Sequence, residues 1–306
     1  LVETNKTLQG LSIDIVVIYS VPTNGLSVLI AAKGLGIPIV FRSIDYLHKL
    51  VGNPLLTSIT KVLEKVVYRN VDCILPDAPC YSDYVKAMGA KEAKVGYLPA
   101  AVDTVVFSSG EVDRPSVMKS LGLEISDQVA IFMGSLFDFS GLDLLVEDFS
   151  SVLAIRPRAR LVIVGEGPQR KKLESIAEAN GISSKVRFTG RVPYLEITKY
   201  LRIADVGVNT FPFTKWTSGI LPGKIFQYLA VGLPVVSTPQ RSLEYLKLTG
   251  LFRSAGDSIV KVLSNTLGAN RRELESQIYV KENHSVTVLG EHLEKVLEEV
   301  IERAKG

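Results

Sequence analysis

The residues best suited to bind a phosphorylated ligand follow four apolar, strand-like segments between residues 129 and 209. In each case a short loop containing glycine, serine or proline leads from the strand towards a helix. Glycines let backbone amides approach a ligand, and the amino end of a helix favours an anion. The chemistry expected of these loops is therefore the binding of phosphate groups.

The first loop spans residues 134–141. Gly134, Ser135 and Ser140 are expected to contact the ligand through the loop and the amino end of the following helix. Ser140 is equally suited to cap that helix, since serine is among the preferred N-cap residues. The two roles are compatible, and both stay open at this point.

The second and third loops give weaker signals. Gly165 and Gly167 begin a glycine-rich pattern, but Arg170 stands where a dinucleotide-binding fingerprint has its third glycine. A tight turn at the start of a helix explains these glycines as well as a ligand does. In the third loop, Arg191 and Val192 are expected to meet the edge of a nucleobase, and a plain turn is again the alternative.

The fourth loop is the most informative, because it leads through a proline to an amphipathic helix expected at 222–231. Its small residues predict a phosphate cradle. The expected ligand contacts are Lys215, Trp216, Ser218, Gly219 and Ile220 in the loop and Lys224 and Gln227 on the helix. Trp216 is the only tryptophan of the chain, and it suits packing as well as recognition.

Two residues in the first half of the chain complete the candidate site. Asp45 and His48 follow an apolar, strand-like segment, and we expect them to be catalytic together with Lys224 and Gln227. His48 would hydrogen-bond an acceptor at the carboxyl end of the strand. The alternative for His48 is a solvated position on a surface helix.

The elements that must position these residues alternate between strands and helices. Strands are expected at 14–19, 38–41, 73–75, 94–98, 129–133, 160–164, 185–189, 205–209 and 234–237. Helices are expected at 26–33, 55–70, 80–88, 141–155, 169–180, 196–203, 222–231 and 289–304. Several strands lack polar alternation, which is typical of strands buried on both faces. The pattern predicts an α/β protein with doubly wound parallel sheets.

The length of 306 residues suggests two domains. The polar segment 108–116 is the expected linker. We expect one Rossmann-like domain from residues 1–107 together with the C-terminal helix 286–306, and a second from residues 117–285.

Composition excludes several classes of protein. The chain is 46% hydrophobic and has a net charge of +3, which is too small an excess to predict a nucleic-acid partner. Cys73 and Cys80 are expected to be reduced, buried thiols of a cytoplasmic protein rather than metal ligands. No apolar stretch is long enough to span a membrane.

From Ala130 to Ser237 the chain resembles the nucleotide-binding domain of family 4 glycosyltransferases, which are retaining enzymes of the GT-B fold. The segments that carry the resemblance are IFMGSLFDFSGLDLLVEDF, ARLVIVGEGPQRKKLE, VRFTGRVPYLEITKYLRIADVGVN and LPGKIFQYLAVGLPVVST. The segments with a weaker resemblance to the family are DIVVIYS, IPIVFRSID, LPAAVDTVVF and ENHSVTVLGEHLEKVL. The resemblance implies two domains facing a cleft. The second would bind a nucleoside-diphosphate sugar, and the first would bind a glycan or lipid-linked acceptor.

The resemblance also implies chemistry without a cofactor or metal ion, in which positive side chains and helix amino ends stabilise the leaving diphosphate. The chain departs from the family at several of these positions. Ser135 and Ser140 stand where the family usually has arginine and lysine, and Gln227 replaces a glutamate that binds ribose. Gly219 and Ile44 replace an acidic residue and a histidine. We expect Lys215 and Lys224 to restore positive charge.

Two other functions remain open. A non-catalytic relative that binds a glycan or a partner subunit would explain the replaced residues. A nucleotide-sugar epimerase of the same fold would need several acid and base groups, of which only Asp45, His48 and Glu244 are evident.

Peripheral contact with the inner face of a membrane is also expected, since lipid-linked acceptors would require it. The candidate residues are Leu47, Leu50, Val51, Leu55 and Leu56, with Lys49 and Lys61; a buried helix face is the alternative for most of them. The chain begins at Leu1 and has no counterpart of the family's opening glycine-rich loop. We therefore expect residues to be missing in front of it and the first domain to be incomplete.

Overall fold

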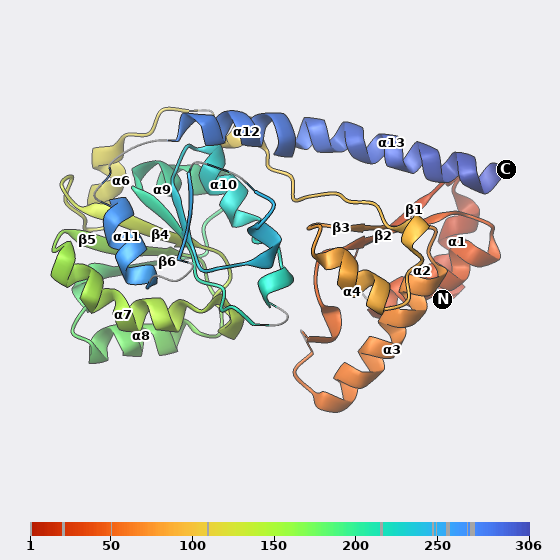
Figure 1. Cartoon of the computed structure of the whole chain (residues 1–306), viewed down its shortest axis with the longest axis horizontal. Coiled ribbons are helices and arrows are strands. Elements are labelled where there is room, and N and C mark those ends of the chain that lie inside the picture. Colours follow the sequence, from red (N-terminus) through yellow and green to blue (C-terminus); the bar gives the residue numbers. More distant parts are fainter. Residues whose placement is uncertain are drawn as a thin grey trace. The chain divides into compact units, whose positions relative to one another are not determined.

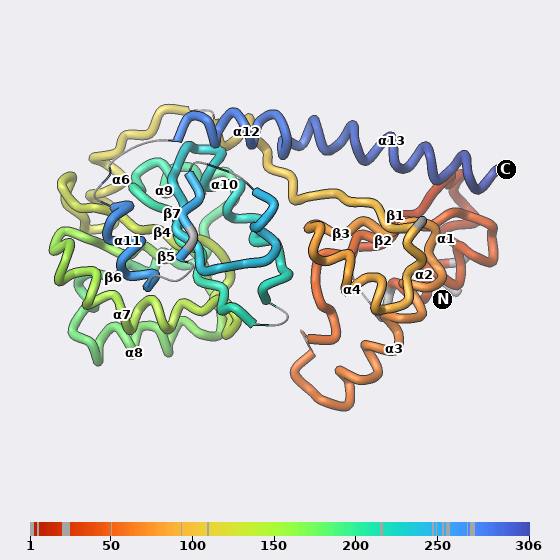
Figure 2. The backbone as a smooth tube through the Cα atoms, in the orientation of Figure 1, coloured from red at the N-terminus to blue at the C-terminus, as the bar shows by residue number. Residues whose placement is uncertain are grey.

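The computed structural model describes residues 2–19, 22–49, 51–108, 110–214, 217–246, 248, 250–254, 258–267, 269 and 273–306; the remaining residues are grey in Figure 2. The chain divides into two compact units. Unit 1 comprises Leu1–Ala100, Gly219–Leu221 and Thr287–Gly306, and unit 2 comprises Ala101–Ser218 and Pro222–Val286.

Unit 1 contains a parallel sheet of three strands in the order β1-β2-β3 (Figure 1). The strands are β1 (Val16–Tyr19), β2 (Ile39–Ser43) and β3 (Cys73–Pro76). The helices are α1 (Val2–Gly10), α2 (Pro22–Gly34), α3 (Pro54–Asn70), α4 (Tyr81–Ala87) and most of α13 (Val286–Lys305), with the 3₁₀ helices η1 (Leu47–Lys49) and η2 (Glu92–Lys94).

Helices cover both faces of this sheet, so every residue of β2 and β3 is buried. On one face Ile39, Phe41 and Ile74 pack with residues of α2 and α3. On the other face Val40 and Leu75 pack against Leu289 and Val300 of α13. The absence of polar alternation in these strands follows from this burial on both sides.

Unit 2 contains a parallel sheet of six strands in the order β6-β5-β4-β7-β8-β9. The strands are β4 (Gln128–Met133), β5 (Ala159–Val164), β6 (Val186–Gly190), β7 (Val206–Asn209), β8 (Val235–Ser237) and β9 (Leu251–Arg253). The helices are α5 (Thr104–Ser108), α6 (Arg114–Ser120), α7 (Leu142–Ile155), α8 (Arg170–Ala179), α9 (Ile197–Ile203), α10 (Lys224–Ala230), α11 (Ile259–Leu267) and α12 (Leu274–His284); the 3₁₀ helices are η3 (Asp138–Ser140), η4 (Ser183–Lys185), η5 (Tyr194–Glu196), η6 (Thr217–Gly219) and η7 (Arg241–Leu243).

Counted from β4, the strand order of unit 2 is 3-2-1-4-5-6, which is the Rossmann order. Its core forms where side chains of β4, β5 and β7 meet α7, α8 and α11, including Phe132, Phe149 and Leu263. The doubly wound α/β prediction is confirmed in both units.

The elements differ from the expected ones at a few places. The strand expected at 94–98 is wrong: Val95 forms only an isolated bridge with Ile74, and the segment then runs through Gly96 towards Pro99. Strand β9 was not expected, because its three residues give too short an apolar run. Helix α10 begins at Lys224 rather than at Pro222. Among the described residues, no helix combines the length and apolarity needed to cross a membrane.

Candidate functional site

The site in unit 2 lies where the order of strands reverses. Strands β4 and β7 are neighbours in the sheet. From β4 the chain continues to β5 on one side, and from β7 it continues to β8 on the opposite side. In doubly wound sheets this reversal opens a crevice outside the carboxyl ends of the strands, where ligands bind. The loops that begin at Gly134 and Thr210 therefore flank the expected binding position.

The first and second loops are tied to each other by backbone hydrogen bonds. Gly134 N donates to Val164 O at 2.9 Å, and Leu136 N donates to Glu166 O at 3.1 Å. Gly165 N in turn donates to Gly190 O at 3.0 Å. These three amides are therefore not free for a phosphate. The glycines allow the close approach of the loops, because a Cβ at Gly165 or Gly167 would collide with backbone of the first loop.

The first loop also approaches the segment after β7, through Gly141. This residue has a φ of +64° and is the N-cap of α7, so the expectation that Ser140 caps the helix is wrong. A Cβ at Gly141 would lie 2.1 Å from Thr210 O, which excludes a side chain there. The Ser140 hydroxyl instead donates to Phe137 O at 2.6 Å, because the chain makes a 3₁₀ turn before the helix begins.

Five of the residues expected to contact a ligand line one pocket of about 180 Å³. They are Gly134, Ser135, Gly165, Arg191 and Val192, and Met133, Val164, Glu166 and Ile197 complete the wall. Ser135 and Arg191 are exposed, so their polar groups are free to face a ligand. Gly167, Ser140, Lys224 and Gln227 are not part of this wall.

Lys224 is a half-buried residue whose ammonium is enclosed by aromatic rings. Its Nζ lies 3.7 Å from the ring centroid of Phe132 and 5.0 Å from that of Phe211. A Cβ atom added at Gly134 would lie 3.1 Å from Lys224 Nζ, so the ammonium is directly beside the first loop. No ion pair with Lys224 occurs within the described part of the chain, and burial lowers its pKa to about 7.

Gln227, one turn after Lys224, interacts with Tyr194 of η5, which directly follows the third loop. Burial raises the pKa of Tyr194, and a hydrogen bond with the side chain of Gln227 opposes that rise. Tyr194 lies in η5, two residues after Val192 of the pocket wall. Helix α10 is thus connected to both the first and the third loop.

Two expected contacts, Lys215 and Trp216, lie outside the described residues. Ser218 is 3% exposed and lies in η6. Gly219 and Ile220 are grouped with unit 1 rather than with the unit of the other loops. Their roles stay predictions.

In unit 1, the expected catalytic residues follow β2. Asp45 is half-buried, and burial raises its pKa. His48 is 4% exposed, so a solvated surface position is wrong. Its Nδ1 lies 2.7 Å from Glu64 Oε2 and 3.2 Å from the Tyr84 hydroxyl. Burial lowers the pKa of His48 and raises that of Glu64 to about 7, so burial disfavours the charged form of each group.

The sequence patterns did not reveal the partners of these residues. Glu64 lies three residues before the buried Val67 of α3, a spacing that would have placed it on the buried face of the helix. Phe132, in β4, and Phe211, in the loop after β7, surround the Lys224 ammonium. No sequence pattern joins them to a lysine on another element.

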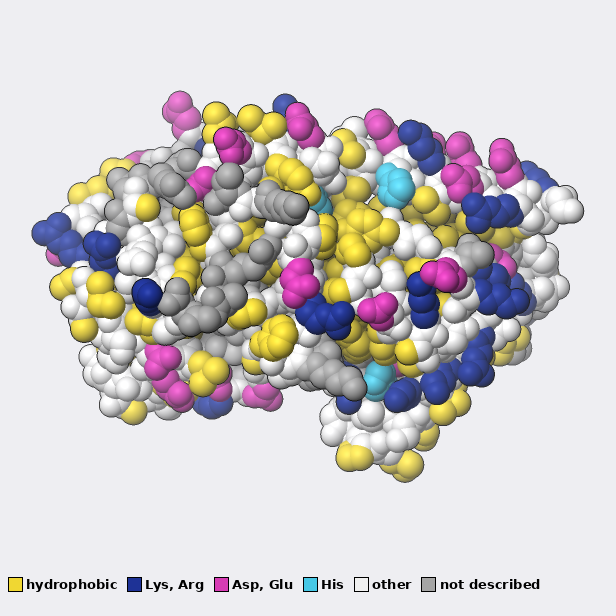
Figure 3. All heavy atoms as spheres, viewed as in Figure 1, with side chains coloured by type: hydrophobic (Ala, Val, Ile, Leu, Met, Phe, Trp, Pro, Cys, Tyr) yellow, Lys and Arg dark blue, Asp and Glu magenta, His cyan; other side chains and the backbone are white. Residues whose placement is uncertain are grey.

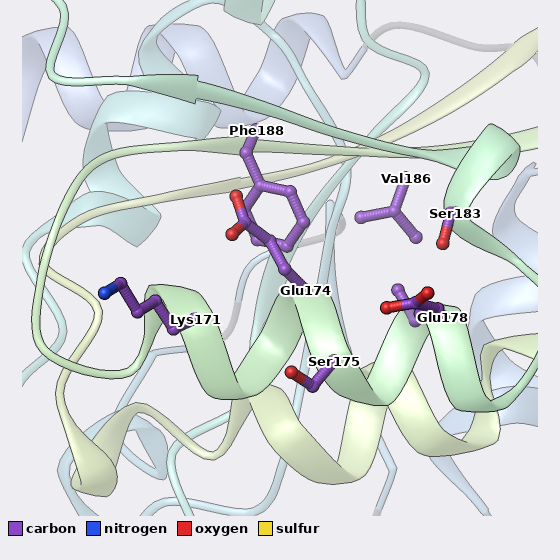
Figure 4. Close-up of a pocket in the computed structure, with 8 residues that line it drawn as sticks. Lys171, Glu174, Ser175, Glu178, Ser183, Val186 and Phe188 are labelled. Carbon is purple, nitrogen blue, oxygen red and sulfur yellow. The ribbon is translucent and has the colours of Figure 1, made fainter.

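Unit 2 also has a groove that is lined by none of the residues expected to contact a ligand. A groove of about 460 Å³ lies between α8 and β6 and is lined by residues including Lys171, Glu174, Glu178 and Phe188 (Figure 4). Within the described residues, no group of three or more histidine, cysteine, aspartate or glutamate side chains is placed to hold a metal ion.

Two protein-family models match the chain. "Glycosyl transferases group 1" matches residues 127–267, and "Glycosyl transferase 4-like domain" matches residues 3–101. Together they cover well over half of the sequence, and the first contains all four loops.

Two relatives share moderate sequence identity with the chain. It is 28% identical over 215 residues to a phosphatidylinositol N-acetylglucosaminyltransferase subunit of Arabidopsis thaliana. The aligned residues cover 69% of this chain and 45% of the relative. It is 27% identical over 190 residues to D-inositol 3-phosphate glycosyltransferase of Segniliparus rotundus, covering 61% of this chain and 39% of the relative. The chain thus spans less than half the length of these two relatives.

Solved structures are similar in fold at lower identity. HepE of Anabaena, in complex with UDP and glucose, superposes with a TM-score of 0.78 at 14% identity, covering 97% of this chain and 81% of HepE. Sucrose-phosphate synthase of Thermosynechococcus elongatus gives a TM-score of 0.76 at 14% identity, covering 99% and 77%.

Proposed function

Because this chain belongs to the family 4 glycosyltransferases and has their GT-B fold, we propose that it transfers a sugar from a nucleoside-diphosphate sugar to a hydroxyl group of an acceptor. The transfer keeps the configuration of the anomeric carbon and needs no metal ion. The acceptor is a glycan or a lipid-linked molecule. Inositol-containing acceptors in the names of two relatives support this choice.

The observation that carries the proposal is the Lys224 ammonium, which is enclosed beside Gly134 without an anionic partner among the described residues. A buried cation is costly unless something pairs with it. The faces of Phe132 and Phe211 compensate in part, since cation–π contacts contribute about 0.5–2 kcal/mol. A diphosphate at the carboxyl ends of β4 and β7 would supply the missing negative charge.

The same cation accounts for the replaced residues of the first loop. Ser135 and Ser140 leave that loop without the usual positive charge, and Ser140 uses its hydroxyl on Phe137 O. Lys224 approaches the loop from α10 instead. As charge develops on the leaving diphosphate, a cation already in place stabilises it without reorganisation.

We expect the protein to bind one class of nucleoside-diphosphate sugar in titration calorimetry with UDP-glucose, UDP-N-acetylglucosamine and GDP-mannose. Binding should persist in EDTA, because Lys224 rather than a metal ion meets the diphosphate. Proton NMR of the product formed with an accepted hydroxyl compound should show the anomer of the donor. The absence of binding by every donor at millimolar concentration would contradict the proposal.

A non-catalytic binding protein is the second candidate, since Ser135, Ser140 and Gln227 replace charged residues of the family. Gln227 can still hydrogen-bond a ribose hydroxyl, but without charge assistance. Donor binding without any transfer to polyols, glycans or lipid-linked sugars would favour this candidate.

We also propose that α3 of unit 1 rests on an anionic membrane surface, where a lipid-linked acceptor would lie. Its exposed apolar residues repeat at helical spacing: Leu55, Ile59, Val62 and Val66, with Leu56 beside them. Lys49, Lys61, Lys65 and Arg69 flank this face, while Glu64, the only acidic residue of the helix, is buried. Figure 3 shows hydrophobic side chains at the lower edge of the molecule, where Figure 1 places α3, next to a row of lysine and arginine side chains. Leu47 of the expected patch is buried, and Leu50 lies outside the described residues.

We expect the protein to sediment with vesicles that contain phosphatidylglycerol and much less with phosphatidylcholine alone, and salt should weaken the binding. Replacing Leu55 and Val62 together by serine should reduce binding at least about tenfold, because burial of each side chain is worth about 1.5–3 kcal/mol. Leu144→Ser in α7, where the side chain is also exposed, is the control. Equal loss in this control would contradict a specific role of α3.

A further inference from the structure

Strand β6 forms one edge of the sheet of unit 2, and among the described strands it pairs only with β5. In β5, Val164 O accepts a hydrogen bond from Gly134 N on the β4 side, so the backbone groups of Ile163 face β6. The register partner of Ile163 is Phe188. In a parallel pair, a residue that faces its neighbouring strand bonds to the residues on either side of its register partner. The N–H and C=O of Phe188 therefore point away from β5, to the open edge.

Val186, two residues before Phe188, faces the same edge of the sheet. Its carbonyl oxygen accepts a hydrogen bond of 3.1 Å from the guanidinium of Arg187, so a side chain of the strand itself satisfies this acceptor. The N–H and C=O of Phe188 have no such partner within the part of the chain that the structure describes. Unpaired backbone groups at the edge of a sheet are a template for pairing with another strand.

The groove between α8 and β6 runs beside this edge. The side chains of Val186 and Phe188 line it together with residues of α8 (Figure 4). Val186 and Ala177 are buried, and Phe188 is half-buried, so an apolar side chain placed in the groove would remove further apolar surface from water. An open strand edge beside a groove is what strand addition requires. Main-chain hydrogen bonds then give affinity, and pockets for alternate side chains give specificity.

The charges along the groove favour a basic residue at one of its ends. Glu174 and Glu178 both line the groove, but Glu174 Oε1 already accepts a hydrogen bond of 2.9 Å from Arg170 Nε. Glu178 is exposed and forms no ion pair with any residue that the structure describes. Figure 4 shows Glu178 at the end of the groove near Val186 and Lys171 at the opposite end. A basic side chain is therefore attracted to the first end and repelled from the second.

We propose that β6 and this groove bind an extended segment of a partner protein as an additional strand of the sheet. The segment pairs with Phe188 through its backbone, places an apolar side chain against Phe188 and Val186, and places a lysine or arginine beside Glu178. Side chains on one face of a strand are two residues apart, so the basic and apolar residues are separated by one residue. None of the residues expected to bind the donor lines the groove, so this interaction is additional to the proposed transfer.

The test uses the full chain and two blocked heptapeptides. Acetyl-Thr-Arg-Thr-Leu-Thr-Val-Thr-amide suits a strand parallel to β6, and the reversed order suits an antiparallel strand. In hydrogen exchange followed by NMR, the Phe188 amide of the free protein should exchange quickly and the Arg187 amide, which faces β5, slowly. At millimolar concentration one of the peptides should slow exchange at Phe188 at least about tenfold, because its backbone then accepts from this amide. The same peptide with its three central amides N-methylated should not.

Glu178→Lys should weaken binding of the arginine peptide about three- to tenfold, since an attraction between exposed charges becomes a repulsion. The peptide with glutamate in place of arginine should bind this variant more tightly than it binds the unchanged protein. Glu275→Lys in α12 is the matched control, because Glu275 is an exposed glutamate outside the groove. It should bind the arginine peptide as the unchanged protein does.

The proposal is overturned if neither peptide slows exchange at Phe188, or if the N-methylated peptide slows it equally. Binding that is unaffected by Glu178→Lys would also overturn it. Slower exchange at Phe188 with rising protein concentration and no peptide would show a second copy of the chain at this edge instead. A response to maltotriose but to neither peptide would assign the groove to a glycan, and the proposed partner would be wrong.

Discussion

Lys224→Met is expected to weaken binding of the donor diphosphate by about 10- to 150-fold, which corresponds to the 1.5–3 kcal/mol of a hydrogen bond to a charged group. Methionine keeps the length of the side chain between Phe132 and Phe211 but removes the ammonium beside Gly134. Titration calorimetry with the donor that the unchanged protein binds measures the effect.

The same substitution should stabilise the protein in the absence of donor. Burial lowers the pKa of Lys224 to about 7 in the folded chain, whereas the unfolded chain holds the proton up to about pH 10.4. The desolvation penalty is therefore complete below pH 7 and is relieved as pH rises towards 10. We expect Lys224→Met to gain about 1–3 kcal/mol in the free energy of unfolding at pH 6–7, and less at pH 9–10.

Lys171→Met is the matched control, since Lys171 is an exposed lysine of α8 in the same unit. It should change neither donor affinity nor stability. If Lys224→Met bound the donor as tightly as this control does, the diphosphate would have to lie elsewhere. If it were less stable than the unchanged protein at pH 7, Lys224 would be a structural residue held by its aromatic neighbours.

Gly165→Ala is expected to destabilise the protein by at least about 3 kcal/mol. Gly165 has a φ of +148°, and a Cβ there would lie 1.9 Å from Gly134 O. No flexible side chain can yield, because the obstacle is backbone that Val164 O holds through a 2.9 Å hydrogen bond from Gly134 N. Denaturant unfolding monitored by circular dichroism measures the loss.

Gly181→Ala is the control, since it keeps the left-handed backbone but removes the collision. Gly181 has a φ of +66° and no atom within 4 Å of the Cβ position. It should cost only about 1–2 kcal/mol, the ordinary penalty of that conformation. Equal losses in the two variants would show that strain of the backbone, rather than contact between the loops, requires glycine at position 165.

The contact at Gly165 has a functional consequence. Since Gly134, Ser135 and Gly165 line the same pocket, the loops must keep their spacing for a donor to fit. The glycine-rich pattern is therefore needed for the site even where its amides bond to backbone and not to a ligand. If the proposed function holds, a motif that is incomplete as a dinucleotide fingerprint still marks the edge at which the donor binds.

Much of the fold could be predicted from local patterns. The buried strands of both units were recognised by their Val- and Ile-rich runs, because burial between two layers of helices removes polar alternation. The prediction of strands failed for short or interrupted segments, at Val95 and at β9, because pairing with a distant strand decides the conformation of such segments. The start of α10 at Lys224 was missed for a related reason: Pro222 marks a turn that need not begin a helix.

The sequence by itself indicated the family and the α/β class and predicted the sheet edges at which we expect ligands, because these follow from periodicity and from the order of short motifs along the chain. Only the tertiary structure decided what each side chain meets there. The aromatic surroundings of Lys224 and the pairing of His48 with Glu64 both join residues from separate elements. Burial and pairing set the charge of such groups, and both depend on neighbours that are distant in the chain.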